Sequence, residues 1–149
     1  MKKNLIKLVT FIIFIFGSTQ ANAQETIVAQ NELPQSAQTF IKNHFSRHNV
    51  DYIMFERNFL SSNEYTVRFT DGLKIEFDGK GSWKEIDGKY TEIPTDFISK
   101  NILTYVNAKF SNTKIVKIEK VYFGNQEVKL SNGLELIFDS KGNFKRVDD

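Results

Sequence analysis

The sequence predicts an α+β fold in which two helices pack on one face of a shared antiparallel sheet. Three observations predict it: two amphipathic helical patterns, strand-like runs of alternating hydrophobicity, and an internal repeat that holds one helix and one group of strands in each copy. From Val67 the chain reads VRFTDGLKIEFDGKGSWKEID, and from Val128 it reads VKLSNGLELIFDSKGNFKRVD, with nine identities in 21 positions. The two copies are expected to build one tandem domain over residues 33–149.

The N-terminal segment has the three-part pattern of a secretory signal peptide. Three lysines precede the apolar run Leu8–Phe16, and the small residues of Ala21-Asn22-Ala23 follow it. A membrane anchor is the alternative, but a bilayer span takes about 20 apolar residues, and this run is shorter. We therefore expect residues 1–23 to be removed by cleavage after Ala23. This leaves residues 24–32 as a flexible N-terminal tail and no membrane span.

Each copy opens with an apolar residue followed by proline. Leu33-Pro34 and Ile93-Pro94 contain the only two prolines of the chain, and we expect both pairs to occupy the same place. Copy one is then residues 33–88 and copy two is residues 93–149. Because proline is tolerated in the first turn of a helix, each pair predicts a helix start, with the second helix longer. The apolar faces are Ala37, Phe40, Ile41 and Phe45 in the first helix, and Phe97, Ile98, Ile102, Tyr105, Val106 and Phe110 in the second.

Eight strand-like runs and their turns complete the two copies. Asp71-Gly72 and Asn132-Gly133 lie between alternating runs, which predicts antiparallel hairpins with type I′ turns. Asp78 and Asp139 begin looser turns. An Asp in such a turn typically accepts hydrogen bonds from its own backbone, which we favour over a cation loop. The predicted strands are residues 50–58, 64–70, 73–78 and 82–86, then 114–122, 126–131, 134–138 and 143–147.

The pattern D/N-G, F-D-x-K-G and W/F-K occurs twice after the predicted signal peptide. With this pattern the chain resembles the beta-lactamase-inhibitor-like, PepSY-like family of exported bacterial proteins. The resemblance covers nearly all of the chain after residue 23. It implies tandem helix-plus-antiparallel-sheet units and a binding or inhibitory role outside the cytoplasm, and it implies no catalytic residues. Two departures are the longer connection at residues 61–64 of copy one and Phe144 in the place of Trp83.

The charge of the chain argues against nucleic-acid binding. Residues 1–23 hold three of the 20 basic side chains and none of the 18 acidic ones, so the remainder carries 17 against 18, a net charge of −1 with His neutral. Its charges are interspersed in sign, whereas a nucleic-acid binder needs a basic face to neutralise phosphates. The absence of cysteine excludes disulfides, thiolate metal sites and cysteine nucleophiles.

No motif predicts catalysis, a cofactor or a metal. The chain has no G-x-S-x-G, phosphate-binding loop, H-E-x-x-H or dinucleotide-binding pattern, so we expect a protein that is not an enzyme. His44 and His48 are four residues apart near the end of the first helix, as two metal ligands on one helix face would be. No third ligand is evident, so we expect neither histidine to bind a metal.

Exposed aromatic and basic residues on the sheet are the candidates for partner binding. If Ile53 faces the core, alternation points its neighbours to the opposite face, where an arginine and aromatic residues would suit a protein-binding hot spot. Trp83 and Ile86 are three apart, so either a bulge intervenes or one of them is exposed. The alternative is that these aromatic residues lie at the edge of the sheet and fold over its end, without binding a partner. The six candidates are Tyr52, Met54, Arg68, Lys74, Trp83 and Phe144.

These observations predict a periplasmic or secreted module that binds a protein or peptide of the cell envelope, with inhibition of a hydrolase as one form of that role. A carrier of a small molecule or envelope component, with a pocket between helices and sheet, is the alternative. An enzyme is the third hypothesis, and it would require a convergent polar cluster in a cleft.

Overall fold

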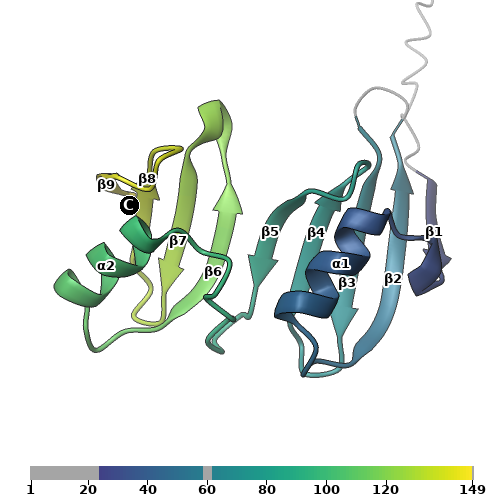
Figure 1. Cartoon of the computed structure of the whole chain (residues 1–149), viewed down its shortest axis with the longest axis horizontal. Coiled ribbons are helices and arrows are strands. Elements are labelled where there is room, and N and C mark those ends of the chain that lie inside the picture. Colours follow the sequence, from purple (N-terminus) through teal and green to yellow (C-terminus); the bar gives the residue numbers. More distant parts are fainter. Residues whose placement is uncertain (1–23, 59–61, 149) are drawn as a thin grey trace, which may run out of the picture.

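The computed structural model describes residues 24–58 and 62–148, and the predicted signal peptide lies outside them. Nine strands form one antiparallel sheet whose spatial order is the order of the sequence (Figure 1). Two α-helices and two short 3₁₀ helices accompany it. The elements are β1 (Gln24–Val28), η1 (Gln30–Glu32), α1 (Gln35–His44), β2 (Val50–Arg57), β3 (Glu64–Phe69), β4 (Lys74–Asp78), β5 (Trp83–Asp87), α2 (Lys100–Lys109), β6 (Ile115–Lys120), η2 (Tyr122–Gly124), β7 (Gln126–Leu130), β8 (Glu135–Phe138) and β9 (Phe144–Asp148).

The eight predicted strands are present, and a ninth strand, β1, occupies residues expected to form a flexible tail. β1 pairs with β2 along its whole length, from Gln24 opposite Arg57 to Val28 opposite Ile53. Val28 also packs against the core. Sequence reasoning missed this edge strand because most of its residues are exposed and the run is too short to show a clear alternation. The expectation of a flexible tail over residues 24–32 is therefore wrong.

The hairpins at Asp71-Gly72 and Asn132-Gly133 are present, but their predicted type I′ geometry is wrong. Only the glycines have positive φ, 91° at Gly72 and 90° at Gly133, whereas a type I′ turn needs positive φ at both central residues. Each glycine N–H donates to the carbonyl three residues earlier, and the Asp71 or Asn132 side chain accepts from the N–H two residues later. The turns are three-residue loops that end on a left-handed glycine.

A register shift in each half of the sheet sets the direction of two aromatic side chains. Between β4 and β5, Lys84 is an extra residue, and Phe77 lies opposite Trp83. Between β8 and β9 the same irregularity puts Phe138 opposite Phe144. Because Phe77 and Phe138 are fully buried in the core, the bulges turn Trp83 and Phe144 toward the helices. A bulge therefore explains the three-residue spacing noted for Trp83.

Both α-helices are ten residues long, so the expectation of a longer second helix is wrong. Ser99 ends the preceding turn, and its side chain accepts a 3.4 Å hydrogen bond from the N–H of Ile102, which is how an N-cap begins a helix. Phe97 consequently lies before α2 and not on it. α1 begins directly after Pro34, but α2 begins six residues after Pro94, so the two prolines do not occupy the same place.

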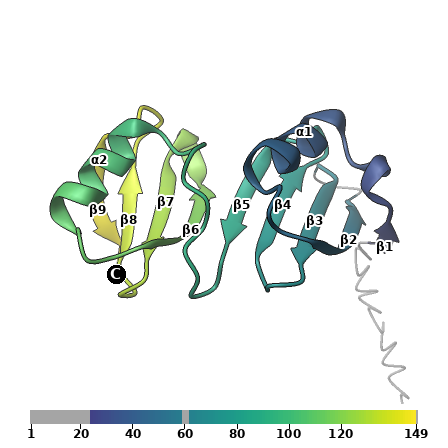
Figure 2. The ribbon, with the colours of Figure 1, turned by 60° about the horizontal axis from the view of Figure 1, so that its bottom comes forward.

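Each helix packs on the glycine turn that precedes the last strand of its own half. The Ser36 hydroxyl of α1 donates to the carbonyl of Lys80 over 2.7 Å, and the Asn101 amide of α2 donates to that of Lys141 over 2.9 Å. Figure 2 shows α1 over β2–β5 and α2 over β6–β9. We call the side of each half under its helix the helix side, and the opposite one the helix-free side. The buried helix residues are Ala37 and Ile41 of α1, and Ile102 and Val106 of α2.

Candidate functional site

The structure divides the six predicted binding residues between the two sides of the sheet. Tyr52 pairs with Arg68 and Arg68 with Lys74, so these three form one row across β2, β3 and β4, on the helix-free side because their chain neighbours are buried in the core. Met54 lies in the next row. Trp83 and Phe144 lie on the helix side, each in a different half. The six residues do not form one surface, and their role in partner binding stays a prediction.

The helix-free side is charged rather than aromatic. Glu85 of β5 is its central group and forms ion pairs with Lys74 and Lys117, the latter over 3.0 Å. Lys74 also forms an ion pair with Glu76 at 2.6 Å, and Lys117 also forms one with Glu119 at 2.8 Å. Burial raises the pKa of Glu85, but hydrogen bonds and Coulomb attraction from the two lysines outweigh it, so this pKa lies below its usual value. Burial lowers the pKa of Lys117, but hydrogen bonds and Coulomb attraction from Glu119 and Glu85 outweigh it, so this pKa lies above its usual value.

This network predicts how stability depends on pH. Because the pKa of Glu85 is depressed in the folded state, its contribution is fully present above the ordinary value of 4.5 and is lost as the pH falls through the folded-state value. Glu85→Gln should therefore lower the free energy of unfolding at neutral pH and reduce its decline in acid. Urea unfolding from pH 7 to about pH 3 measures both effects. An equal change in Glu25→Gln, a variant of an exposed carboxylate on β1, would contradict this role for Glu85.

The two histidines bind carboxylates and not each other. The Nδ1 atom of His44 lies 2.6 Å from an Asp96 oxygen, and that of His48 lies 2.6 Å from an Asp71 oxygen. The hydrogen bond from His48 and that from the N–H of Leu73 outweigh burial, which alone would raise the pKa of Asp71, and they hold this pKa below its usual value. Within residues 24–58 and 62–148, no group of three or more His, Cys, Asp or Glu could hold a metal ion.

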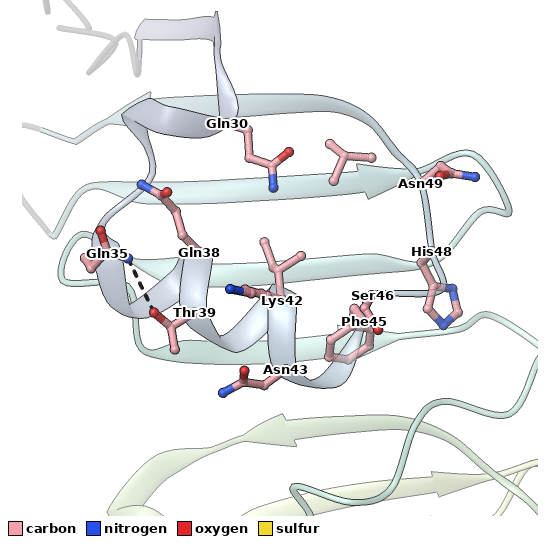
Figure 3. A pocket seen from close by; sticks show the side chains of 12 residues that line it. Gln30, Gln35, Gln38, Thr39, Lys42, Asn43, Phe45, Ser46, His48 and Asn49 are labelled. Atoms are coloured by element: carbon pink, nitrogen blue, oxygen red, sulfur yellow. Dashed lines mark hydrogen bonds between the residues drawn. The ribbon is translucent and has the colours of Figure 1, made fainter.

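A hollow of about 600 Å³ lies along α1, next to His48. Figure 3 shows Gln30 of η1 and Gln38 and Lys42 of α1 around it, and Gln35 donating to the Thr39 hydroxyl. Amide, hydroxyl and amino groups dominate its walls, and the carboxylate that His48 contacts belongs to a β-turn. Among the described residues that line this hollow, no side chain forms a hydrogen bond to the His48 ring as a nucleophile would to its base.

A second kind of pocket, which we call the Trp83 pocket, lies on the helix side between the two halves. Its volume is about 420 Å³, and two aromatic rings, Trp83 and Phe97, line it together with the cation of Lys120. The Lys120 Nζ atom lies 4.1 Å from the centroid of the Trp83 ring, a cation–π contact. The rings of Trp83 and Phe97 are 5.8 Å apart. The polar side chains in the wall are Ser99, Gln126 and Ser140.

The β6–β7 loop at the rim of this pocket exposes two adjacent aromatic residues. The side chain of Phe123 is 99% exposed and that of Tyr122 is 88% exposed, and the next residue, Gly124, is part of the pocket wall. Phe123 has φ 61° and ψ 25° and Gly124 has φ 74°, so both central residues of this turn have positive φ, as in a type I′ turn. The left-handed conformation is costly for a bulky residue such as Phe123. We call residues 122–124 the aromatic loop.

Sequence reasoning identified Trp83 but missed Phe97, Lys120 and the aromatic loop. The apolar spacing predicts Phe97 on the second helix, and the strand predicted over residues 114–122 ends at Tyr122. One signal was available: Tyr122-Phe123 directly precedes Gly124-Asn125, and two aromatic residues at a Gly-Asn turn are more exposed than a strand end would make them.

The comparisons with known proteins agree with the architecture. The family described as "Putative beta-lactamase-inhibitor-like, PepSY-like" matches residues 63–146. A crystal structure described as a putative calcium-regulated periplasmic protein from Bacteroides thetaiotaomicron is 42% identical, with a TM-score of 0.79, and the match covers 84% of this chain and 97% of that one. A putative periplasmic protein of unknown function from Bacteroides vulgatus is 37% identical, with a TM-score of 0.78 and coverage of 85% and 100%.

No curated protein matches the chain. None of the helices between residues 24 and 58 or between 62 and 148 has the length and apolar character needed to cross a bilayer. The family match spans more than half of the chain, and the resemblance noted in its sequence is confirmed. The chain belongs to the beta-lactamase-inhibitor-like, PepSY-like family.

Proposed function

We propose that this protein is an exported, non-enzymatic module that recognises a protein or peptide in the periplasm or outside the cell, with inhibition of a hydrolase as one form of that role. The observation that carries the proposal is the aromatic loop beside the Trp83 pocket. An almost fully exposed Phe123 in a costly backbone conformation has no role in the core of the chain, whereas aromatic residues dominate the energetics of protein interfaces.

Export rests on two independent supports. Residues 1–23 have the pattern of a signal peptide cleaved after Ala23, and the structural relatives are described as periplasmic proteins. One structural relative is described as calcium-regulated, which is a statement about that protein alone. Among residues 24–58 and 62–148 of this chain, no cluster of side chains could hold a metal ion, and the proposal includes no cation.

We also propose that the two halves are copies of one unit, with both helices on one face of the shared sheet. The repeated sequence supports this, as do the matching bulges that place Phe77 opposite Trp83 and Phe138 opposite Phe144. The view in Figure 2, with α1 and α2 above the same sheet, supports the common face. The aromatic loop and Lys120 break the likeness, because the corresponding connection of the first half is the segment around residues 59–61 and has a different sequence.

The first test is capture of a partner from a cell-envelope extract by the immobilised protein. Phe123→Ala is expected to reduce capture at least about ten-fold, since truncating an aromatic hot spot costs about 2 kcal/mol or more. The matched control is Tyr90→Ala, which removes another almost fully exposed aromatic ring, 95% accessible, from the β5–α2 connection. Equal capture by the Phe123→Ala variant and the unchanged protein would contradict a role for the loop.

A carrier function is the second candidate, and the Trp83 pocket favours it. The pocket has a volume of about 420 Å³, within the range of small-molecule sites. The helix–sheet contact itself leaves little room, because Ala37 and Ile102 are fully buried there. A carrier would therefore use the space between the two halves and not the space under a helix.

A further inference from the structure

The charge of the Trp83 pocket differs from that of the helix-free side of the sheet. Of the side chains that line it, Lys120 alone is charged, and no carboxylate is among them. On the helix-free side, by contrast, Lys74 and Lys117 each hold two carboxylates. Within the described part of the chain, no acidic group comes within 4 Å of the Lys120 Nζ atom. The pocket therefore presents one cation to whatever enters it.

Lys120, at the end of β6, is an exposed residue whose amino group is partly covered by the Trp83 ring. The Trp83 ring lies against its amino group at 4.1 Å, and burial lowers its pKa, with only a partial offset from the more distant Asp78. An anion that entered the pocket would reverse this effect, because an opposite charge at short distance favours the protonated amine. Because Lys120 is exposed and forms no ion pair within the described part of the chain, its ammonium group is accessible to a negatively charged group that enters the pocket.

The other walls suit a ligand that is apolar with a polar end. Trp83 and Phe97 offer two ring surfaces for an apolar side chain. Ser99, Gln126 and Ser140 offer hydroxyl and amide groups for hydrogen bonds. Ser99 is also the N-cap of α2, so the positive end of that helix dipole adds to the potential of Lys120.

The aromatic loop supplies exposed apolar side chains next to the pocket. Gly124 in the pocket wall directly follows Tyr122 and Phe123, whose rings are exposed. A small carboxylate would fill the pocket and leave these rings in water. A polypeptide that entered by its end would contact both.

From these observations we infer that the Trp83 pocket binds the C-terminal carboxylate and apolar last side chain of a polypeptide, with Lys120 pairing the carboxylate. The inference rests on the proposed function, because it names the part of the partner that the same region recognises. Residues of the partner ahead of its last one would lie along the aromatic loop.

The test uses Trp83, the single tryptophan of the chain, as a fluorescent reporter in protein purified from the periplasm or medium of the expressing cells. An N-acetylated hexapeptide ending in leucine with a free carboxylate is titrated beside the same peptide amidated at its C-terminus. We expect the amidated peptide to bind about ten-fold more weakly or worse, because a hydrogen-bonded charge pair is lost. Equal binding of the two peptides would overturn the inference.

Variants of Lys120 separate the effect of its charge from the effect of its shape. Lys120→Met keeps most of the length of the side chain without its charge and should remove the preference for the free carboxylate. Lys120→Arg keeps the charge and should retain this preference. Lys109→Met, at the exposed end of α2, is the matched control. Unfolding midpoints equal to that of the unchanged protein establish that each variant folds. An unaltered preference in Lys120→Met would refute the role of this lysine.

A third ligand distinguishes the two sources of such a carboxylate. N-acetyl-leucine carries the same terminal group without the preceding residues, and we expect it to bind more weakly than the hexapeptide. Binding as tight as that of the hexapeptide would overturn the polypeptide assignment in favour of a small carboxylate. If envelope capture depends on Phe123 but persists in Lys120→Met, the carboxylate inference fails while the proposed function stands.

Discussion

Gly81→Ala is expected to lower the free energy of unfolding by about 2 to 5 kcal/mol. Gly81 has φ 83°, where an L side chain is strained, and the loop presses against the start of α1. A β-carbon there would contact the Ser36 hydroxyl, approach the Pro34 Cβ to 2.8 Å and lie 3.0 Å from the backbone nitrogen of Ala37. Backbone strain and overpacking therefore add at one position.

A second glycine separates these two costs. Gly133 has φ 90°, but a β-carbon there would meet nothing within 4 Å, so Gly133→Ala should lose only the backbone part, about 1 to 2 kcal/mol. Chemical denaturation followed by Trp83 fluorescence and circular dichroism measures both variants. If they lose the same stability, the close approach of α1 to the glycine turn is not what makes Gly81 necessary.

The second large effect concerns the buried aromatic residue of each half. Phe77→Ala and Phe138→Ala are each expected to lower the free energy of unfolding by about 3 to 5 kcal/mol, the range for truncating a buried Phe. Both side chains are 0% exposed, and each lies under an aromatic ring of its helix, Phe40 at 6.0 Å and Tyr105 at 5.6 Å.

The halves should unfold together in both variants. β5 and β6 pair across the junction, with the buried Ile86 opposite Ile118, and Phe97 contacts Phe40 of α1 at 5.3 Å and Trp83 at 5.8 Å. We therefore expect fluorescence and circular dichroism to report one shared transition. Two transitions in either variant would show that the halves are independent. Phe123→Ala is the control, and its midpoint should not change because its ring is exposed.

The strands were predictable because their signal is local. Alternation of core and solvent residues is clear in β3, β4 and β7, and Asp71-Gly72 and Asn132-Gly133 mark the β3–β4 and β7–β8 hairpins. The turn type was not predictable from the dipeptide alone, since the same residues fit both a type I′ turn and a three-residue loop. β1 escaped prediction because its pairing with β2, and not its own pattern, makes it a strand.

The candidate site was less predictable because it depends on distant contacts. Trp83 was identified as unusual from its spacing, but the bulge at Lys84 decides that it faces the helices. Phe97 has the spacing of a helical apolar face, and the N-cap at Ser99 excludes it from α2. No periodic pattern brings Lys120 over the Trp83 ring. Only the assembled junction between the halves places these residues together.

The consecutive order of the sheet has a consequence for how the chain reaches its native state. Every strand pairs with its neighbour in sequence, so no pairing has to wait for a remote segment. The connections that must close are short, except for the two that contain α1 and α2. Low sequence separation of contacts favours rapid folding. A chain delivered N-terminus first can bury Ile53, Val67 and Ile75 under α1 before β9 has emerged. The time during which unpaired strand edges are exposed to other molecules is correspondingly brief.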